Sequence, residues 1–176
     1  MLSFSDTMEK GTVAARAVIV GMLVGFFTLA PPARAETPEE WIALGTRVHG
    51  GFGPLIPIGI RIGLDSLTRL KAEPRTVAVS YYSGEKAPCP CISDGVMIAT
   101  QASPGQGTLQ VMAEKAPPGI LASIVVRERK GSAAVRYTVK DEWLPKVVEW
   151  IKALDPMGRY KAVMAAEGLF EVSPAQ

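Results

Sequence analysis

The chain has 176 residues, of which 48% are hydrophobic, 20% charged and 7% aromatic, and its formal net charge is +2. This length suits one domain with its own core and is short for two. Two cysteines exclude a disulfide-rich scaffold and a four-cysteine zinc ribbon, and the near-balance of 19 basic and 17 acidic residues argues against nucleic acid as the main partner.

The first 35 residues have the pattern of a secretory signal peptide. Two basic residues precede a run of thirteen residues without charge, VIVGMLVGFFTLA at 18–30, whereas a membrane-spanning helix needs about 20 apolar residues. Ala33 and Ala35 then form the small-residue pattern of a cleavage site. We expect cleavage after Ala35 and an exported mature chain, 36–176, that is periplasmic or secreted and has no stable membrane anchor. The alternative is an uncleaved anchor.

A helix is predicted at the start of the mature chain. Thr37 is placed to cap it, Pro38 suits its first position, and Glu40 completes a capping box. We expect this helix to end near Val48, before two glycines.

The next segment, 56–71, fits two patterns. Its isoleucines alternate with other residues as in a half-buried strand, yet its apolar residues also fit one helical face, and it is longer than a typical strand. We predict a helix, with Gly59 and Gly63 allowing close packing against a neighbour.

The rest of the chain alternates strand-like and helix-like segments. The expected elements are a strand at 76–82, a short helix at 94–100, a strand at 109–113, a hairpin of strands at 120–128 and 133–139, an amphipathic helix around 144–154 capped by Asp141, and a helix near 156–167. Local antiparallel strands with helices at both ends predict the α+β class, with an antiparallel sheet and flanking helices in a single domain.

Four residues are candidates for metal binding. His49 is the only histidine, and the glycines that follow it let the backbone approach a ligand. Cys89 and Cys91 place two thiols in one loop, and Asp94 follows shortly after. Because thiolate and imidazole are preferred ligands of zinc and similar ions, we predict that His49 and Cys91 share one divalent metal ion, zinc or a similar ion. Cys89 or Asp94 would complete the shell.

Other interpretations of these residues stay open. A lone histidine is more often structural, and a C-x-C motif is also compatible with a strained disulfide, a redox pair or two inert thiols. One hypothesis is a domain that binds a metal or a small ligand without a demonstrable catalytic set. The second is a thiol-based redox protein or enzyme that uses Cys89 and Cys91, and the third is a degenerate interaction module without metal. The sequence leaves open whether the protein is an enzyme.

Several short motifs occur in the order known from one family. HGGFGP at 49–54 is similar to an H-G-H-x-C-P-G segment, and 59–63 to the glycine-containing helix that follows it. CISDGV at 91–96 is similar to a C-x-x-D-[AG]-[IV] helix start, SPGQGTL at 103–109 to a T-x-G-K/R-G-N-L loop, and GLFEV at 168–172 to the closing segment. The mature chain therefore resembles the core domain of the FmdE component of formylmethanofuran dehydrogenase (FmdE-like).

The chain departs from the family pattern at three positions. Gly51 and Gly53 stand where the family has a second histidine and a first cysteine, and Gln106 stands where it often has a basic residue. The zinc ribbon that many members append is also missing from the sequence. We therefore expect a divergent exported member, for which cytoplasmic formylmethanofuran chemistry is not expected.

The resemblance also implies a ligand set and an assembly. The family core is understood to bind a metal through the histidine and cysteine of these motifs, which carries over to His49 and Cys91 here, with Asp94 as a further candidate. Cys89 is a candidate substitute for the lost thiol. The family further implies a homodimer, and the glycines at 51 and 53 leave a coordination position for water or a small ligand.

Overall fold

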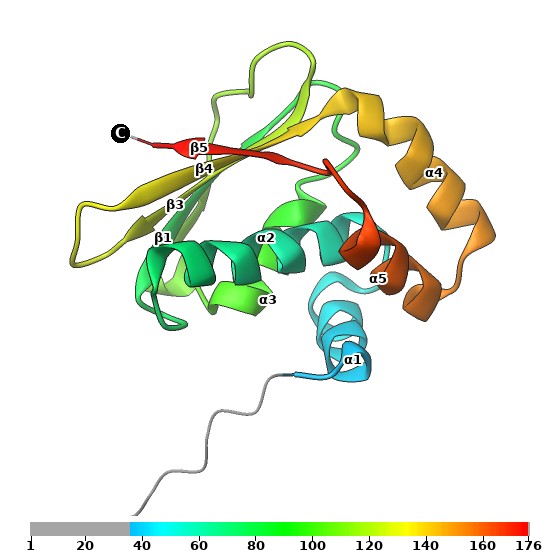
Figure 1. The fold of residues 1–176 in the computed structure, drawn as a ribbon, viewed down its shortest axis with the longest axis horizontal. Helices are drawn as coiled ribbons and strands as arrows, with labels where there is room; N and C mark the ends of the chain where they lie inside the picture. Colours follow the sequence, from blue (N-terminus) through cyan, green and yellow to red (C-terminus); the bar gives the residue numbers. More distant parts are fainter. Residues whose placement is uncertain (1–35, 176) are drawn as a thin grey trace, which may run out of the picture. The chain divides into compact units, whose positions relative to one another are not determined.

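The computed structural model describes residues 36–175, so the predicted signal peptide lies outside the described residues. The described residues form one compact unit, and Figure 1 shows a sheet with helices packed beside it. The α+β class is therefore confirmed. Among the described residues, no helix is long and apolar enough to cross a membrane.

The described helices follow the predicted order. They are α1 (Pro38–His49), α2 (Leu55–Leu70), α3 (Cys91–Thr100), α4 (Leu144–Ala153) and α5 (Pro156–Ala165), with short 3-10 turns η1 (Pro104–Gln106) and η2 (Asp141–Trp143).

The predicted capping box of α1 is present. The Thr37 hydroxyl accepts from the Glu40 amide, and the Glu40 carboxylate accepts from the Thr37 amide at 2.7 Å. The helix ends at His49, one residue later than expected, and Gly50 closes it with a φ of 86°, which glycine adopts readily.

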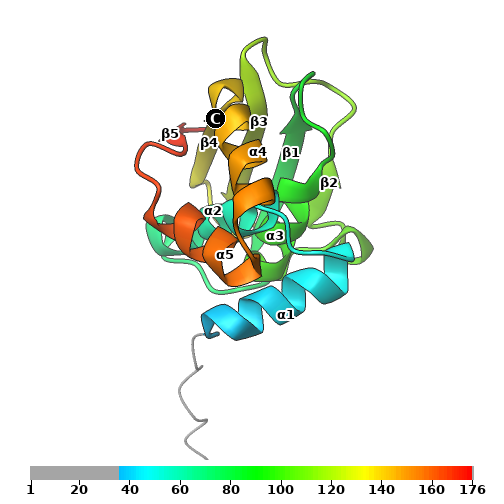
Figure 2. The ribbon, with the colours of Figure 1, turned by 90° about the vertical axis from the view of Figure 1, so that its right-hand side faces the viewer.

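The five strands of the described chain form one sheet. They are β1 (Val77–Ser83), β2 (Leu109–Val111), β3 (Ile120–Glu128), β4 (Ala134–Lys140) and β5 (Glu171–Pro174), in the order β2-β1-β3-β4-β5. Figure 2 shows β5 and β2 at opposite edges. All neighbouring pairs are antiparallel except β1 and β2, which are parallel because the chain crosses over through α3 between them.

Two predicted helix starts differ from the structure. Asp141 does not cap α4: it lies in η2, and its carboxylate pairs with Lys86 at 2.7 Å, while Trp143 precedes α4 without a side-chain cap. The helix predicted from position 94 begins at Cys91, where the Pro90 carbonyl already accepts the Ser93 amide at 2.9 Å.

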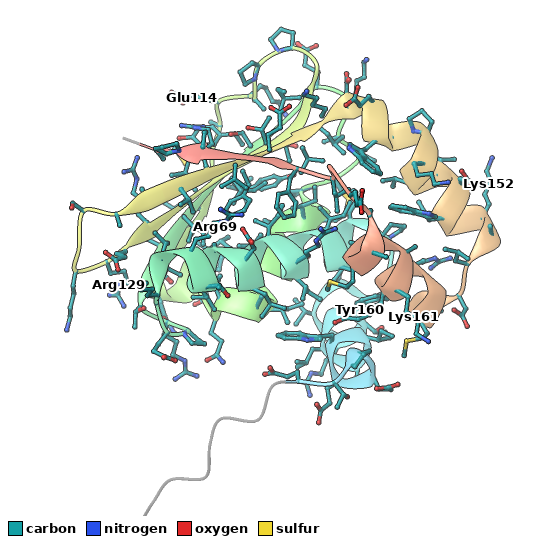
Figure 3. All side chains as sticks on the ribbon, in the orientation of Figure 1. Arg69, Glu114, Arg129, Lys152, Tyr160 and Lys161 are labelled. Carbon is teal, nitrogen blue, oxygen red and sulfur yellow. A yellow bond between two sulfur atoms is a disulfide. The ribbon has the colours of Figure 1, made fainter. Side chains whose placement is uncertain are left out.

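Two helices make a close crossing beside the sheet. An added Cβ at Gly59 of α2 would collide with the Ile92 carbonyl, and one at Gly95 of α3 would collide with the Ile56 carbonyl. The predicted close packing at Gly59 is therefore confirmed. Side chains of α2 fill the space between this helix and the sheet (Figure 3). The glycine crossing then sets the position of α3 against α2, and with it that of Cys91 at the start of α3.

Candidate metal centre

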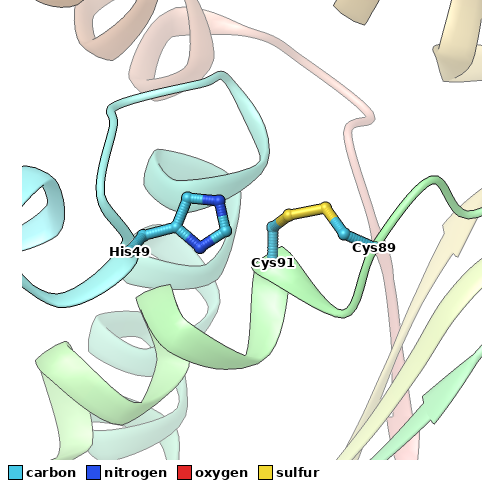
Figure 4. A group of neighbouring side chains, drawn as sticks. All are labelled: His49, Cys89 and Cys91. Atoms are coloured by element: carbon cyan, nitrogen blue, oxygen red, sulfur yellow. A yellow bond between two sulfur atoms is a disulfide. The ribbon is translucent and has the colours of Figure 1, made fainter.

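Three of the predicted ligands lie together in the structure. His49 is the last residue of α1, Cys89 lies in the loop after β1, and Cys91 is the first residue of α3. One ligand atom from each lies within 4.8 Å of the others. Figure 4 shows the His49 ring beside the two sulfur atoms. A histidine and two cysteines at this spacing can hold a metal ion.

The two cysteines are joined to each other. Cys89 and Cys91 form a disulfide, with their Cα atoms 5.2 Å apart. This is the arrangement that the sequence left open as an alternative to metal binding. The structure therefore describes the oxidised form of the group. Because the thiolate is the form that ligates a metal, metal binding requires that the disulfide be reduced.

Asp94 contacts the histidine. Its Oδ2 lies 2.8 Å from Nδ1 of His49. Since a carboxylate accepts, Nδ1 donates, and in the neutral form of the ring Nε2 then offers its lone pair to a ligand. A carboxylate that orients a histidine in this way is common behind metal ligands. The predicted role of Asp94 as a direct ligand stays a prediction, because here its contact is with the ring.

The group lies at the border between core and solvent. Cys91 is 6% exposed, whereas the His49 and Asp94 side chains are 31% and 34% exposed. A metal ion or small molecule can therefore reach the group from solvent, while Cys91 is held by its buried surroundings.

The backbone after His49 has open space at two of its glycines. A Cβ added at Gly51 or Gly53 would meet nothing within 4 Å. The two positions at which the resemblance implied a lost histidine and a lost cysteine are thus sterically open in this chain. The open coordination position stays a prediction.

One residue of this region was not predicted from the sequence. The Arg159 side chain on α5 donates from Nη1 to the Phe52 carbonyl at 3.2 Å and from Nη2 to the Ile151 carbonyl at 2.7 Å. It thereby ties the glycine-containing loop after His49 to α4 and α5. No local pattern marks this arginine, because its partner Phe52 lies 107 residues away.

In the loop at 103–109, Ser103 makes hydrogen bonds to other residues of the same loop. Ser103 caps η1 by accepting from the Gln106 amide at 3.3 Å, and its carbonyl accepts from the Thr108 and Leu109 amides. These contacts are those of a structural turn.

The comparison with known proteins bears on these motifs. No curated protein matches the sequence. The family described as "FmdE, Molybdenum formylmethanofuran dehydrogenase operon" matches residues 48–169. The match begins just before His49, contains every candidate ligand and covers more than half of the chain, so the chain belongs to the FmdE family.

Proposed function

We propose that the protein is a metal-binding domain in which His49 and the reduced forms of Cys89 and Cys91 hold one divalent ion. The observation that carries this proposal is the approach of the three ligand atoms to within 4.8 Å of one another. One imidazole and two thiolates favour zinc or a similar ion over calcium and magnesium, which prefer oxygen ligands.

Three protein ligands would leave a fourth position for water or a small molecule. A bound zinc ion would supply a Lewis-acidic position there. The residues of the chain then have distinct tasks: His49 and the thiolates bind, and Asp94 holds the proton on Nδ1 of His49. We assign Asp94 a positioning role, and the proposal is one of binding without an assigned catalytic group.

Zinc titration of the reduced full-length chain tests this proposal. We expect one ion per chain, and a loss of affinity of more than about 100-fold in His49→Ala and Cys91→Ser, since even an outer partner of a ligand contributes about 10–100-fold. Arg47→Ala is the matched control, because Arg47 is exposed on the last turn of the same helix. Variants at 49 and 91 that bind zinc as tightly as the parent would overturn the proposal.

A second candidate function is thiol–disulfide exchange, which the disulfide itself favours. It predicts that the chain accelerates the reduction of a small disulfide by a dithiol, and that Cys89→Ser abolishes this effect. No rate above that of the reagents alone would contradict it. If neither zinc binding nor exchange is found, the third hypothesis remains, an interaction module whose pocket has degenerated.

We also propose that the protein is exported and processed before Glu36. The support is the signal-peptide pattern of the first 35 residues. N-terminal sequencing of protein from the exporting cell should find Glu36 as the first residue. Membrane-associated protein that begins at Met1 would contradict this.

A further inference from the structure

We propose that Cys89 and Cys91 form a redox gate on the metal site: their sulfur atoms are bonded either to each other or to the ion. This inference rests on the proposed metal-binding function and adds its regulation. The described disulfide is then the closed state of the gate.

Both states use the same atoms in nearly the same place. In a tetrahedral site with zinc–sulfur distances of about 2.3 Å, the two sulfurs lie about 3.8 Å apart. The three ligand atoms already lie within 4.8 Å in the oxidised form. The opening therefore requires the sulfurs to separate by a rotation of side chains, while the Cα atoms 5.2 Å apart can stay in place.

The other parts of the site are fixed independently of the disulfide. Cys91 is held at the start of α3 by the glycine crossing with α2. His49, at the end of α1, is oriented by Asp94, which lies on α3 like Cys91. The loop that follows His49 is held by the hydrogen bond from Arg159 to the Phe52 carbonyl. Reduction thus frees two ligands in a site whose third ligand is already oriented.

Reduction has an accessible point of attack. Cys89 is partly exposed, whereas Cys91 is buried. A dithiol reductant attacks Sγ of Cys89, forms a mixed disulfide and releases Cys91 as the leaving thiolate. The second thiol of the reductant then displaces Cys89. The reductant leaves as a disulfide, and two electrons and two protons have passed to the cysteine pair.

The gate has a reciprocal consequence. A metal that binds only the reduced pair must disfavour its oxidation, in the way that any ligand stabilises the state it binds. Free zinc at about 100 times its dissociation constant shifts the oxidation equilibrium about 100-fold, which raises the midpoint potential of the cysteine pair by about 60 mV.

A redox titration of the full-length chain tests the gate. The chain is equilibrated in glutathione buffers with and without buffered free zinc, and free thiols are counted by alkylation. The parent and Arg47→Ala should show the shift of about 100-fold. In His49→Ala the two thiols should still oxidise to the disulfide, which shows that the loop holding Cys89 and Cys91 is intact. Zinc should shift the oxidation equilibrium of this variant much less than that of the parent.

A second experiment measures the zinc affinity of the oxidised and reduced chain directly. The oxidised parent should bind zinc at least about 100-fold more weakly than the reduced parent, as the linkage requires. Cys89→Ser should bind weakly under both conditions, without a response to the oxidant. If the reduced parent binds zinc but its oxidation equilibrium does not respond, the gate is wrong and the metal site stands. If the reduced parent binds no zinc, the proposed function fails and the gate falls with it.

Discussion

At the scale of single residues, Asp94 is the most informative position after the ligands. Asp94→Ala removes the acceptor that orients His49, so the reduced chain should bind zinc about 10–100-fold more weakly. Asp94→Asn should lose less, because an amide oxygen can still accept from Nδ1. Competition with a chromogenic chelator measures both affinities. Equal affinity of the parent and both variants would show that Asp94 does not position the histidine.

A second residue-scale prediction concerns stability in alkali. The buried Tyr137 hydroxyl donates to Asp65 at 2.6 Å. Burial, and then the bond to Asp65, raise the pKa of Tyr137 above its ordinary value of 10.0. Above about pH 10 the unfolded chain releases this proton and the folded chain keeps it, so the free energy of unfolding must fall as pH rises.

Tyr137→Phe tests that linkage. At neutral pH the variant should lose about 1.5–3 kcal/mol for the missing bond to a charged acceptor. Above about pH 10 its free energy of unfolding should decline less steeply with pH than that of the parent. Some decline remains in the variant, because burial also raises the pKa of Tyr81. Urea denaturation at several pH values measures this. Identical slopes for parent and variant would contradict the assignment.

At the scale of elements, the crossing of α2 and α3 places Cys91 in the site. Gly59→Ala puts a methyl group against the Ile92 carbonyl. This carbonyl belongs to the backbone, which cannot move aside as easily as the end of a flexible side chain. We expect a loss of about 1–3 kcal/mol in the free energy of unfolding. Gly53→Ala is the control, because its methyl group would meet nothing within 4 Å, and it should stay within about 0.5 kcal/mol. Denaturant melts that rank the two variants equally would contradict this role of the crossing.

Local patterns were sufficient for most elements of the fold. The capping residues at Thr37 and Glu40 predicted the start of α1, and the apolar face of 56–71 predicted α2 despite its alternating isoleucines. The parallel pairing of β1 with β2 could not be predicted, because it depends on how the chain crosses between them. Asp141 was assigned a cap that the structure does not contain, because its partner Lys86 is remote in sequence.

For the candidate site too, the sequence predicted some features, and others depend on the fold. The residue types and family motifs marked His49, the two cysteines and Asp94, and the structure brings the ligand atoms of the first three together. The contact of Asp94 with the His49 ring joins residues 45 positions apart, and that of Arg159 with Phe52 spans 107 positions. Such contacts arise from packing, so no local pattern reveals them.

At the scale of the whole molecule, the remaining expectation is the homodimer implied by the family. Large apolar side chains are exposed on α4, where Val148 and Ile151 lie one helical turn apart. Exposed apolar residues of this kind are compatible with a buried interface. Light scattering on the processed chain should give about twice the monomer mass. A monomer mass at tens of micromolar protein would contradict the dimer without affecting the fold.

The most direct test of the metal site is X-ray absorption at the zinc edge of the reduced, zinc-loaded full-length chain. We expect two sulfur neighbours at about 2.3 Å, from Cys89 and Cys91, and nitrogen or oxygen neighbours at about 2.0–2.1 Å, from His49 and the open position. In Cys91→Ser the sulfur contribution should fall to one neighbour. A parent spectrum with only nitrogen and oxygen neighbours would contradict the proposed site, because the ion would then lie away from the cysteines.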